Sequence, residues 1–390
     1  MILLRAGWVL PVDRPPLQDG GVAVRTGRVV WVGRMAEAPR GEVRDLGPGV
    51  LLPGLVNAHC HLELSNLAGR LEGASGFAQW AERLVGARAL DPPDVVRSRA
   101  AEALAAVEAS GTAALGDVSN TLVHLDLVAA SAVRVRAFFE LIGWDPARAE
   151  ELMAQAQARI ASSGEGVSLS IAAHAPHSVS PALFRAMREA GGPAALHLAE
   201  SPHERRFLDG GDPEWSAFLA RRGLAHVRFD PPRRSPVRYM DDLGVLHPGL
   251  VAAHGVQVDA ADCALLAARG VAVALCPRSN RALGVGMAPL PVLREAGVRL
   301  CVGTDSLASV PSLDLWEDVL ALHRAWPGIE PEWLLRTATR GGAEALGFDD
   351  LGRIGSGAPA AFAFAEGPAS LPDPMAFLFS GEARLRGVRP

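Results

Sequence analysis

The sequence contains no lysine, so arginine supplies every one of its 38 basic residues. This absence excludes a Schiff-base lysine, the lysine of a phosphate-binding P-loop and a carboxylated lysine that bridges two metal ions. Cysteine is also scarce, with four residues and no CxxC pair, and nothing in their spacing indicates a disulfide framework. The chemistry of the chain must therefore rest on other side chains.

Long apolar runs are missing as well. Residues 1–14 have too short an apolar run for a signal peptide and lack a small-residue cleavage site. No run approaches the length of a membrane span. A formal net charge of -5 with 21% charged residues gives no basic stripe for nucleic acid. We expect a cytoplasmic protein with a small-molecule, nucleoside-like substrate and with no membrane or nucleic-acid partner, and the sequence is compatible with a homodimer.

The pattern of the chain predicts two structural parts. Residues 1–53 and 351–390 consist of short β-rich runs separated by turn signals, and each piece alone is too small to fold. We expect them to form one small β-sandwich domain assembled from both termini. Residues 54–350 alternate strands with Ala-, Leu- and Arg-rich helices, and eight strand candidates predict an α/β fold, a (β/α)8 TIM barrel. A doubly wound open sheet is the rival, weakened by the absence of a GxGxxG turn after a strand.

The clearest site signal is the segment Asn57–Ser65, which follows an apolar run typical of a buried strand. His59 and His61 are two residues apart, so in a strand their imidazoles point to the same side. An HxH pair alone is more typical of structural histidines at a strand end. Here, however, other predicted strands also end in polar residues, and the active site of a barrel lies at these ends. The additional strand ends carry His174 and His177, His197 and Glu200, His254, Cys276–Asn280, and Gly303–Ser306.

Three neutral imidazoles and one carboxylate form a normal ligand set for one divalent metal ion, with zinc as the first choice and ferrous iron as the alternative. The four ligands that we predict are His59, His61, His197 and Asp305. A bound metal lowers the pKa of water toward ~7, and Asp305 can also accept a proton from that water. Glu200 lies outside the ligand set and suits a general acid and base, while His254 can orient the nucleophile. The predicted catalytic residues are thus Glu200, His254 and Asp305.

Several other polar residues have weaker patterns. His174 and His177 follow a strand, which favours substrate contact. Cys60 lies between two proposed ligands and should point away from the metal as a small buried residue. Asp117 ends the second barrel strand, where it caps or braces the barrel mouth. Surface, capping or structural roles are expected for His124, His203, His226, His247 and His323.

These motifs resemble the amidohydrolase superfamily, specifically its deaminase and chlorohydrolase branch. The matching segments are LPGLVNAHCH at 52–61, HLAE at 197–200, HG at 254–255 and GTDS at 303–306, and the resemblance covers nearly the whole chain. It implies hydrolytic deamination at one metal. The implied roles are the same four metal ligands, Glu200 as proton shuttle and His254 as the residue that orients water.

A finer resemblance is to the 6-amino-6-deoxyfutalosine deaminases, which act on an adenosine-like intermediate of the futalosine route to menaquinone. It rests on HCHLELS at 59–65, FAQW at 77–80, FELIG at 139–143, HAPHSVS at 174–180, CPRSN at 276–280 and DSLAS at 305–309. Adenosine-type and S-adenosylhomocysteine deaminases share much of this pattern and are the alternative. Val310 stands where the resemblance implies Asn, which affects substrate contacts, and residues 358–361 read APAA in place of an Asp-containing turn of the β-domain.

A substrate of the futalosine type carries a benzoate arm, and the planar fork of arginine is well suited to a carboxylate. Arg278, in the turn after the seventh barrel strand, is the first candidate, and Arg148, after the third strand, is the second. A structural ion pair explains either arginine about equally well. The other expected substrate contacts are His174, Asn280, Trp80 as an apolar wall, Glu63 and Ser306.

Two other functions stay open. A cyclic-amide hydrolase of the dihydroorotase kind commonly uses two metals bridged by a carboxylated lysine, which this chain cannot make. A catalytically dead scaffold of the same fold usually loses ligands, whereas here the whole set is present. Metal analysis separates the three, with about one equivalent expected for the deaminase, two for the amide hydrolase and none for the scaffold.

Overall fold

The computed structural model describes residues 1–71, 76–163, 167–192, 194–227 and 229–390. Its larger part is a closed barrel of parallel strands, in the order β10-β11-β12-β13-β6-β7-β8-β9. This confirms the predicted (β/α)8 fold. The barrel strands are β6 (Leu55–Cys60), β7 (Thr112–Ser119), β8 (Arg134–Leu141), β9 (Ser168–Ala173), β10 (Ala195–Leu198), β11 (Val251–His254), β12 (Ala272–Leu275) and β13 (Arg299–Val302).

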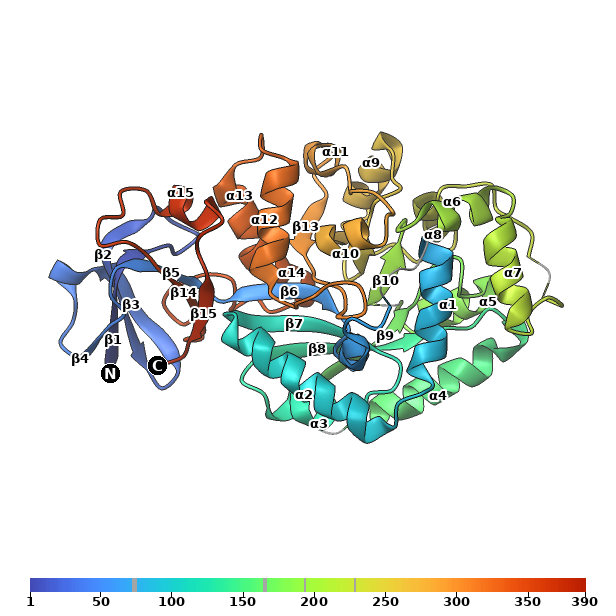
Figure 1. Ribbon diagram of the computed structural model, residues 1–390, viewed down its shortest axis with the longest axis horizontal. Helices are drawn as coiled ribbons and strands as arrows, with labels where there is room; N and C mark the ends of the chain where they lie inside the picture. The colour runs from blue at the N-terminus through green and yellow to red at the C-terminus, as the bar shows by residue number, and fades with distance from the viewer. Residues whose placement is uncertain (72–75, 164–166, 193, 228) are drawn as a thin grey trace.

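Helices cover the outside of the barrel, because each parallel strand must bury both of its faces; β6 and β7 are buried along their whole length. Figure 1 shows the helices around the strands. The helices are α1 (Phe77–Arg88), α2 (Pro93–Ala109), α3 (Leu125–Ala130), α4 (Ala149–Ala161), α5 (Pro181–Glu189), α6 (Pro202–Asp209), α7 (Pro213–Arg221), α8 (Pro236–Asp242), α9 (Ala260–Ala268), α10 (Pro277–Ala282), α11 (Leu290–Glu295), α12 (Leu315–Ala325), α13 (Pro331–Arg336) and α14 (Gly342–Leu346).

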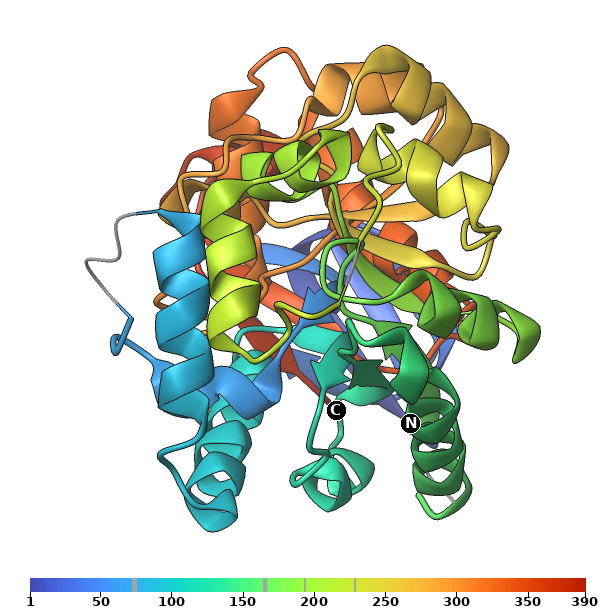
Figure 2. The same ribbon diagram turned by 90° about the vertical axis from the view of Figure 1, so that its right-hand side faces the viewer.

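Between β10 and β11 the chain forms α6, α7 and α8 in place of the single helix of a simple repeat. Each of these helices has proline in its first turn. The side chain of the residue before the helix accepts a hydrogen bond from a backbone N–H of that turn; these capping residues are Ser201, Asp212 and Ser235. These are typical helix starts, because proline needs no N–H partner and the cap satisfies one that is free. Figure 2 shows α1 and α7 beside each other at the end of the molecule that faces the viewer.

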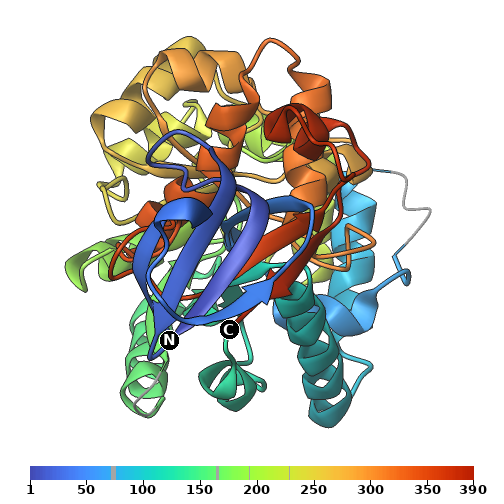
Figure 3. The same ribbon diagram turned by 90° about the vertical axis from the view of Figure 1, so that its left-hand side faces the viewer.

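The second part is a mixed sheet built from both ends of the chain (Figure 3). The sequence predicted one small β-sandwich domain assembled from both termini, and a domain built from both termini is confirmed. Instead of two packed sheets, the structure has one seven-stranded sheet. In this sheet β4 and β5 both pair with the same edge of β1, and both run parallel to it. Its strands are β1 (Ile2–Val9), β2 (Leu17–Arg25), β3 (Arg28–Arg34), β4 (Glu42–Asp45), β5 (Gly49–Pro53), β14 (Phe362–Glu366) and β15 (Leu385–Val388), with α15 (Pro374–Phe379) between the last two.

This sheet leads directly into the barrel. β5 ends at Pro53, and β6 begins after Gly54, so the first barrel strand starts beside the sheet and its carboxyl end lies away from it. The site residues predicted from the sequence therefore gather at the barrel end remote from the sheet. Among the described residues, no helix is long and apolar enough to cross a membrane.

Candidate metal centre and active site

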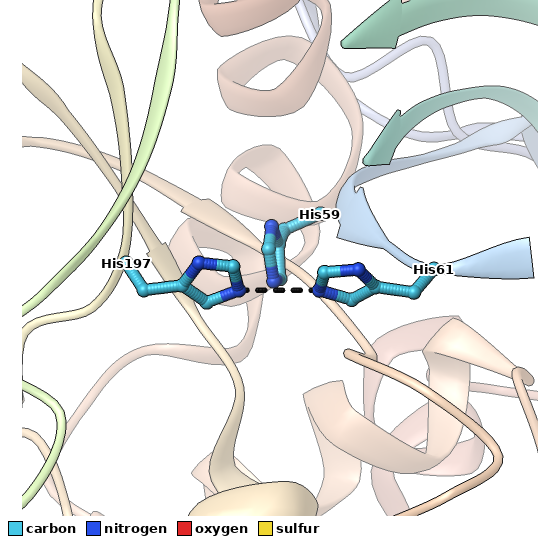
Figure 4. A group of neighbouring side chains, drawn as sticks. All are labelled: His59, His61 and His197. Carbon is cyan, nitrogen blue, oxygen red and sulfur yellow. Dashed lines mark hydrogen bonds between the residues drawn. The ribbon is translucent and has the colours of Figure 1, made fainter. Parts of the chain in front are cut away.

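Three histidines meet at the carboxyl ends of β6 and β10. His59 and His61 come from the end of β6, His197 lies in β10, and their rings point toward one another (Figure 4). The Nε2 atoms of His61 and His197 are 3.1 Å apart, and one ligand atom from each of the three rings lies within 4.8 Å of the others. All three side chains are buried, with exposed fractions of 3–7%.

The protonation of these rings suits a metal ion. Burial lowers the pKa of His59 and of His197, so both are neutral at pH 7 and each keeps a lone pair on one ring nitrogen. The Nε2 of His59 is buried and has no hydrogen-bond partner among the described residues. A buried polar atom without a partner is costly, and a cation held by the three rings would satisfy it. The donor set thus fits a divalent metal.

Asp305 faces the same point from the segment that follows β13. Its Oδ1 lies 3.6 Å from Nε2 of His61 and 3.9 Å from Nε2 of His59. Its Oδ2 accepts hydrogen bonds from the hydroxyls of Ser279, at 2.5 Å, and Ser309, at 3.0 Å. Burial opposes ionisation, but His61, His254 and His197, together with the hydrogen bond from Ser279, lower the pKa of Asp305. One carboxylate oxygen is therefore held by serines while the other is directed at the histidines.

Close packing of two barrel strands sets this position. The N–H groups of Thr304 and Asp305 donate to the carbonyl of His59, at 3.0 and 3.1 Å. A Cβ at Gly303 would stand 2.8 Å from that carbonyl oxygen, so only glycine lets the two segments approach this closely. Gly303 thereby fixes Asp305 beside His59.

Glu200 and His254 complete the centre. Glu200 follows β10 and is 8% exposed, and its Oε1 lies 3.6 Å from Nε2 of His254. Burial raises the pKa of Glu200 to about 7, with the Asp305 carboxylate adding to the shift and His197 opposing it. Nδ1 of His254 lies 2.8 Å from Oδ1 of Asn280, which accepts a hydrogen bond from Nδ1–H, so the lone pair of Nε2 is left toward Glu200. A carboxyl with a pKa near neutrality can both take and give a proton at pH 7.

Three of these strand ends adopt a left-handed backbone without glycine. The φ angles are +53° at Ala199, +77° at His254 and +63° at Asp305. Such a conformation costs roughly 1–2 kcal/mol per residue for L-amino acids. Strain of this kind persists where surrounding contacts fix it, and it concentrates at functional sites.

A buried carboxylate that sequence reasoning missed holds the first of these turns. Glu204 is fully buried, and its two oxygens accept the N–H groups of Ala199, at 3.0 Å, and Glu200, at 2.8 Å. Its own N–H donates to the hydroxyl of Ser201, the cap of α6. Burial raises the pKa of Glu204 to about 8. The spacing Ser201-x-x-Glu204 is that of a capping box and could have indicated this role.

A cavity of about 560 Å³ opens beside these residues. Ser309, which donates to Asp305, lines the cavity, as does Pro202, two residues beyond Glu200, so the cavity lies next to the segments that carry these two carboxylates. Trp80 lines it as predicted, and its Nε1–H donates to the carbonyl of Ala308 at 3.3 Å. The full lining is Leu71, Gly76, Phe77, Trp80, Pro202, His203, Arg206, Ala282–Val285, Ala308 and Ser309. A pocket of this size and mixed character suits a small organic molecule.

With this geometry in place, comparison with known proteins identifies the family. A model of the amidohydrolase family matches residues 50–385. The chain belongs to the amidohydrolase family. It is 32% identical to the aminodeoxyfutalosine deaminase of Deinococcus radiodurans over 84% of this chain and 81% of the relative. It is 30% identical to the 5-methylthioadenosine/S-adenosylhomocysteine deaminase of Nitratidesulfovibrio vulgaris strain DP4, over 92% and 82%.

A solved structure agrees with both the fold and the family. The adenosine deaminase of Xanthomonas campestris, with bound zinc, superposes with a TM-score of 0.79 at 27% identity. The match covers 98% of this chain and 89% of that one. The barrel and the terminal sheet of this amidohydrolase thus belong to one shared architecture.

Two further groups orient His197 in this amidohydrolase. Its Nδ1–H donates to the carbonyl of His174 at 2.9 Å, which leaves Nε2 for the metal. The carboxylate of Glu140, at the end of β8, lies 3.4 Å from the same Nδ1. The sequence did not single out Glu140. The ring of His174 is 5.0 Å from that of His197, whereas His177 is buried against Trp215 with ring centroids 4.4 Å apart.

Other predicted substrate residues are engaged elsewhere. Glu63, on the 3₁₀ helix Leu62–Leu67, was predicted to contact substrate. Instead, its two oxygens accept hydrogen bonds from Arg88, Ser119 and the Asn120–Thr121 segment. The carboxylate therefore stabilises the loop after β7. Asn280 was expected at the ribose or purine edge, but its Oδ1 holds His254. Ser306 is fully buried, and its hydroxyl has no partner in the described part of the chain.

The structure contradicts the prediction for Arg278. Its Nε and Nη2 bind Asp318, its Nη1 binds Ser312 and Glu317, and Nη2 also donates to the carbonyls of Ser312 and Asp314. Asp318 is fully buried, so the guanidinium neutralises a core carboxylate and has no donor left for a substrate. Arg148 is exposed, pairs with Glu151 and does not line the cavity.

The second strand end behaves as a brace. Asp117 accepts the N–H of Leu62, at 2.9 Å, and binds Nε2 of His124, at 2.6 Å. Leu62 follows His61, so this pair holds the segment that carries a proposed metal ligand. His203, expected as a capping or surface residue, lines the cavity and stacks on Phe77 with ring centroids 6.2 Å apart.

Proposed function

We propose that the protein is a metal-dependent hydrolase that removes the 6-amino group of an adenosine-like nucleoside, with 6-amino-6-deoxyfutalosine as its substrate in the futalosine route to menaquinone. The observation that carries this proposal is the placement of Glu200 and His254 beside the three-histidine centre, with Oε1 and Nε2 3.6 Å apart. A cavity of about 560 Å³, lined by the neighbouring residues Pro202 and Ser309, gives room for a substrate. The 32% identity to an aminodeoxyfutalosine deaminase supports the choice of substrate.

The residues that would hold the metal are His59, His61, His197 and Asp305. Three imidazole nitrogens and one carboxylate oxygen suit zinc, and the zinc-bound relative supports that choice, with ferrous iron as the alternative. When bound, such an ion acts as a Lewis acid that makes water acidic enough to react near neutral pH. The positioning of water and the proton transfers are carried out by side chains of the protein.

Hydrolytic deamination adds water at C6 of the purine and releases ammonia. In this mechanism Asp305 and His254 would bind the attacking water, because Oδ1 of Asp305 faces the histidine centre and Nε2 of His254 carries an acceptor lone pair. Glu200, with a pKa raised to about 7, takes one proton from the water and delivers it to the ring nitrogen N1, and Asp305 transfers the second proton, from the new hydroxyl on C6, to the departing amine. The C6–N bond breaks, the amine leaves as ammonia, and the oxygen of water remains on C6 as the carbonyl of a hypoxanthine-type product.

A second candidate is deamination of 5′-methylthioadenosine or S-adenosylhomocysteine. The 30% identity to a deaminase of that name over 92% of this chain favours it. The chemistry at C6 is the same in both cases. The two candidates differ only in the group on the 5′ carbon, which the wall of the cavity must select.

The test is an absorbance assay of the purified protein loaded with zinc or ferrous iron. We expect conversion of the adenine chromophore to hypoxanthine, with one ammonia released per nucleoside consumed and about one metal per chain. The Glu200→Gln variant is the matched control, because it keeps the metal ligands and removes the proton carrier. Two metals per chain with turnover of a cyclic amide would favour the amide hydrolase, and no turnover of any 6-aminopurine nucleoside would refute the proposal.

A further inference from the structure

One arginine of the cavity has donors free for a ligand. Arg206, on α6, lines the cavity, and its side chain is 53% exposed. Its Nε donates to Asp212 at 2.8 Å and its Nη2 lies 3.0 Å from Nδ1 of His203, while Nη1 has no partner among the described residues. We propose that Arg206 and the aromatic side chains Phe77 and Trp80 of the same cavity form a subsite for an aromatic carboxylate on the 5′ side of the nucleoside. This inference rests on the proposed deaminase function.

The guanidinium is held in place rather than mobile on the surface. Its partner Asp212 is 1% exposed and also accepts the N–H of Trp215, at 2.9 Å, as the cap of α7. The bond to Nε restrains the plane of the guanidinium, and Nη1 keeps donors that no described residue occupies. A fixed planar fork is the geometry that binds a carboxylate through two parallel hydrogen bonds.

The wall of the cavity suits an aromatic body on the ligand. Phe77 and Trp80 project from α1, with ring centroids 6.2 Å apart. Phe77 also stacks on His203 at 24° between the ring planes, so the aromatic surface continues to Arg206. Leu71 and Leu283 add apolar surface. An aryl ring packs on such a surface, with its carboxylate toward the arginine.

The charges of the lining discriminate between 5′ groups. No carboxylate belongs to the described residues that line the cavity. An amino-acid arm such as homocysteine would bring an ammonium group that no carboxylate of the described lining receives, and a methylthio arm would leave Arg206 unused. A group that carries only a carboxylate matches the lining best.

Other arginines fit this role less well. Arg278 has all its donors engaged, and Arg148 lies outside the lining. Arg88 is nearer to the centre, but it pairs with the buried carboxylate of Glu63 at 2.7 Å and is not among the lining residues. Arg205, the neighbour of Arg206, binds Asp209 at 2.9 Å and provides a matched control.

The experiment compares kcat/KM for 6-amino-6-deoxyfutalosine with that for its primary-amide analogue, which keeps the ring and loses the charge. Wild-type protein should prefer the acid, and Arg206→Met should reduce this preference by about 10- to 100-fold. Arg206→Lys should retain part of it, because it keeps the charge without the fork. Arg205→Met should keep the full preference. Isothermal titration with the deaminated acid product should show the same order of affinities without turnover.

Three outcomes overturn the subsite. They are an unchanged acid-to-amide preference in Arg206→Met, an equal loss of preference in Arg205→Met, and product affinity independent of Arg206. A loss in Arg88→Met in place of Arg206→Met would move the subsite to α1 and also refute the assignment. Failure of the proposed function gives a different result, since wild-type protein would then deaminate none of these nucleosides, and the product titration would still test Arg206.

Discussion

The hydroxyl of Ser279 should control how tightly the centre binds its metal. This side chain is fully buried at the start of α10, and it donates to Oδ2 of Asp305 at 2.5 Å. The other oxygen of Asp305 is directed at His59 and His61. Ser279→Ala deletes the shorter of two hydroxyl bonds to Oδ2 and leaves the bond from Ser309, at 3.0 Å, in place. The carboxylate can then rotate away from the histidines.

The magnitude follows from the charge on the acceptor. A hydrogen bond to a charged group contributes about 1.5–3 kcal/mol, and loss of a group that orients a ligand typically weakens metal binding by about 10- to 100-fold. Because Ser309 still holds Oδ2, we expect the lower end of this range, about 10-fold or 1.4 kcal/mol, in Ser279→Ala. Loss of both hydroxyls in Ser279→Ala/Ser309→Ala should approach about 100-fold.

The assay is titration of the metal-free protein with zinc against a chelator of known affinity. Ser306→Ala is the matched control, because this hydroxyl is equally buried beside Asp305 but has no partner among the residues described. It should bind zinc as wild-type protein does. The reasoning is refuted if Ser279→Ala binds zinc as tightly as wild type, or if Ser306→Ala weakens binding to the same extent.

Four other predictions follow from the site and its surroundings. Glu200→Gln should keep its metal and lose kcat by about 10²- to 10⁴-fold, and normal turnover would remove Glu200 from the mechanism. Burial raises the pKa of Glu200 to about 7, and a bound cation can only lower it. Because Glu200 must be ionised to accept a proton, kcat/KM should rise with pH through a midpoint at or below about 7 and then level off. This pH-dependent rise should be absent in Glu200→Gln. His61→Ala and Asp305→Ala should each lose metal by elemental analysis, and full occupancy in both would contradict the ligand set. Arg278→Met should leave Asp318 buried without its counter-charge and lower the free energy of unfolding by about 3–5 kcal/mol in urea, whereas wild-type stability would show that the pair contributes nothing.

The parts of the site that the sequence predicted are those governed by simple periodicity. His59 and His61 follow from the two-residue repeat of a strand, and the barrel rule places the residues that end other strands at the same opening. The histidine cluster and the direction of Asp305 agree with that expectation. The fold class could also be predicted from the sequence, because few known architectures are compatible with eight alternations of strand and helix.

The residues that were missed or misassigned depend on contacts between distant segments. Glu140, at the end of β8, lies beside Nδ1 of His197 in β10, and no spacing in the sequence reveals this contact. Glu204 is the exception, because it binds the N–H groups of Ala199 and Glu200 a few residues away, and its spacing from Ser201 could have indicated that role. Arg278 occupies a turn of the correct strand, yet its partner Asp318 lies on α12 and captures the guanidinium. Arg206 was overlooked because the position of its helix depends on the packing of α6 and α7 rather than on a strand end.

The terminal domain illustrates a similar limit. Alternating β-rich runs predicted strands from both termini, and these strands are present. The number of sheets that these strands form, and whether neighbouring strands run parallel or antiparallel, depend on which strand edges pair. The parallel pairings of β1 with β4 and β5 follow from connections whose paths the local pattern does not encode.

The measurement that tests the central claim most directly is the ranking of kcat/KM for three nucleosides with one metal-loaded, wild-type preparation. The substrates are 6-amino-6-deoxyfutalosine, 5′-methylthioadenosine and S-adenosylhomocysteine. The arrangement of Arg206, Phe77 and Trp80 around the cavity predicts that the carboxylate-bearing 6-amino-6-deoxyfutalosine leads by about 10-fold or more. A higher kcat/KM for either of the other two nucleosides would contradict the proposed substrate.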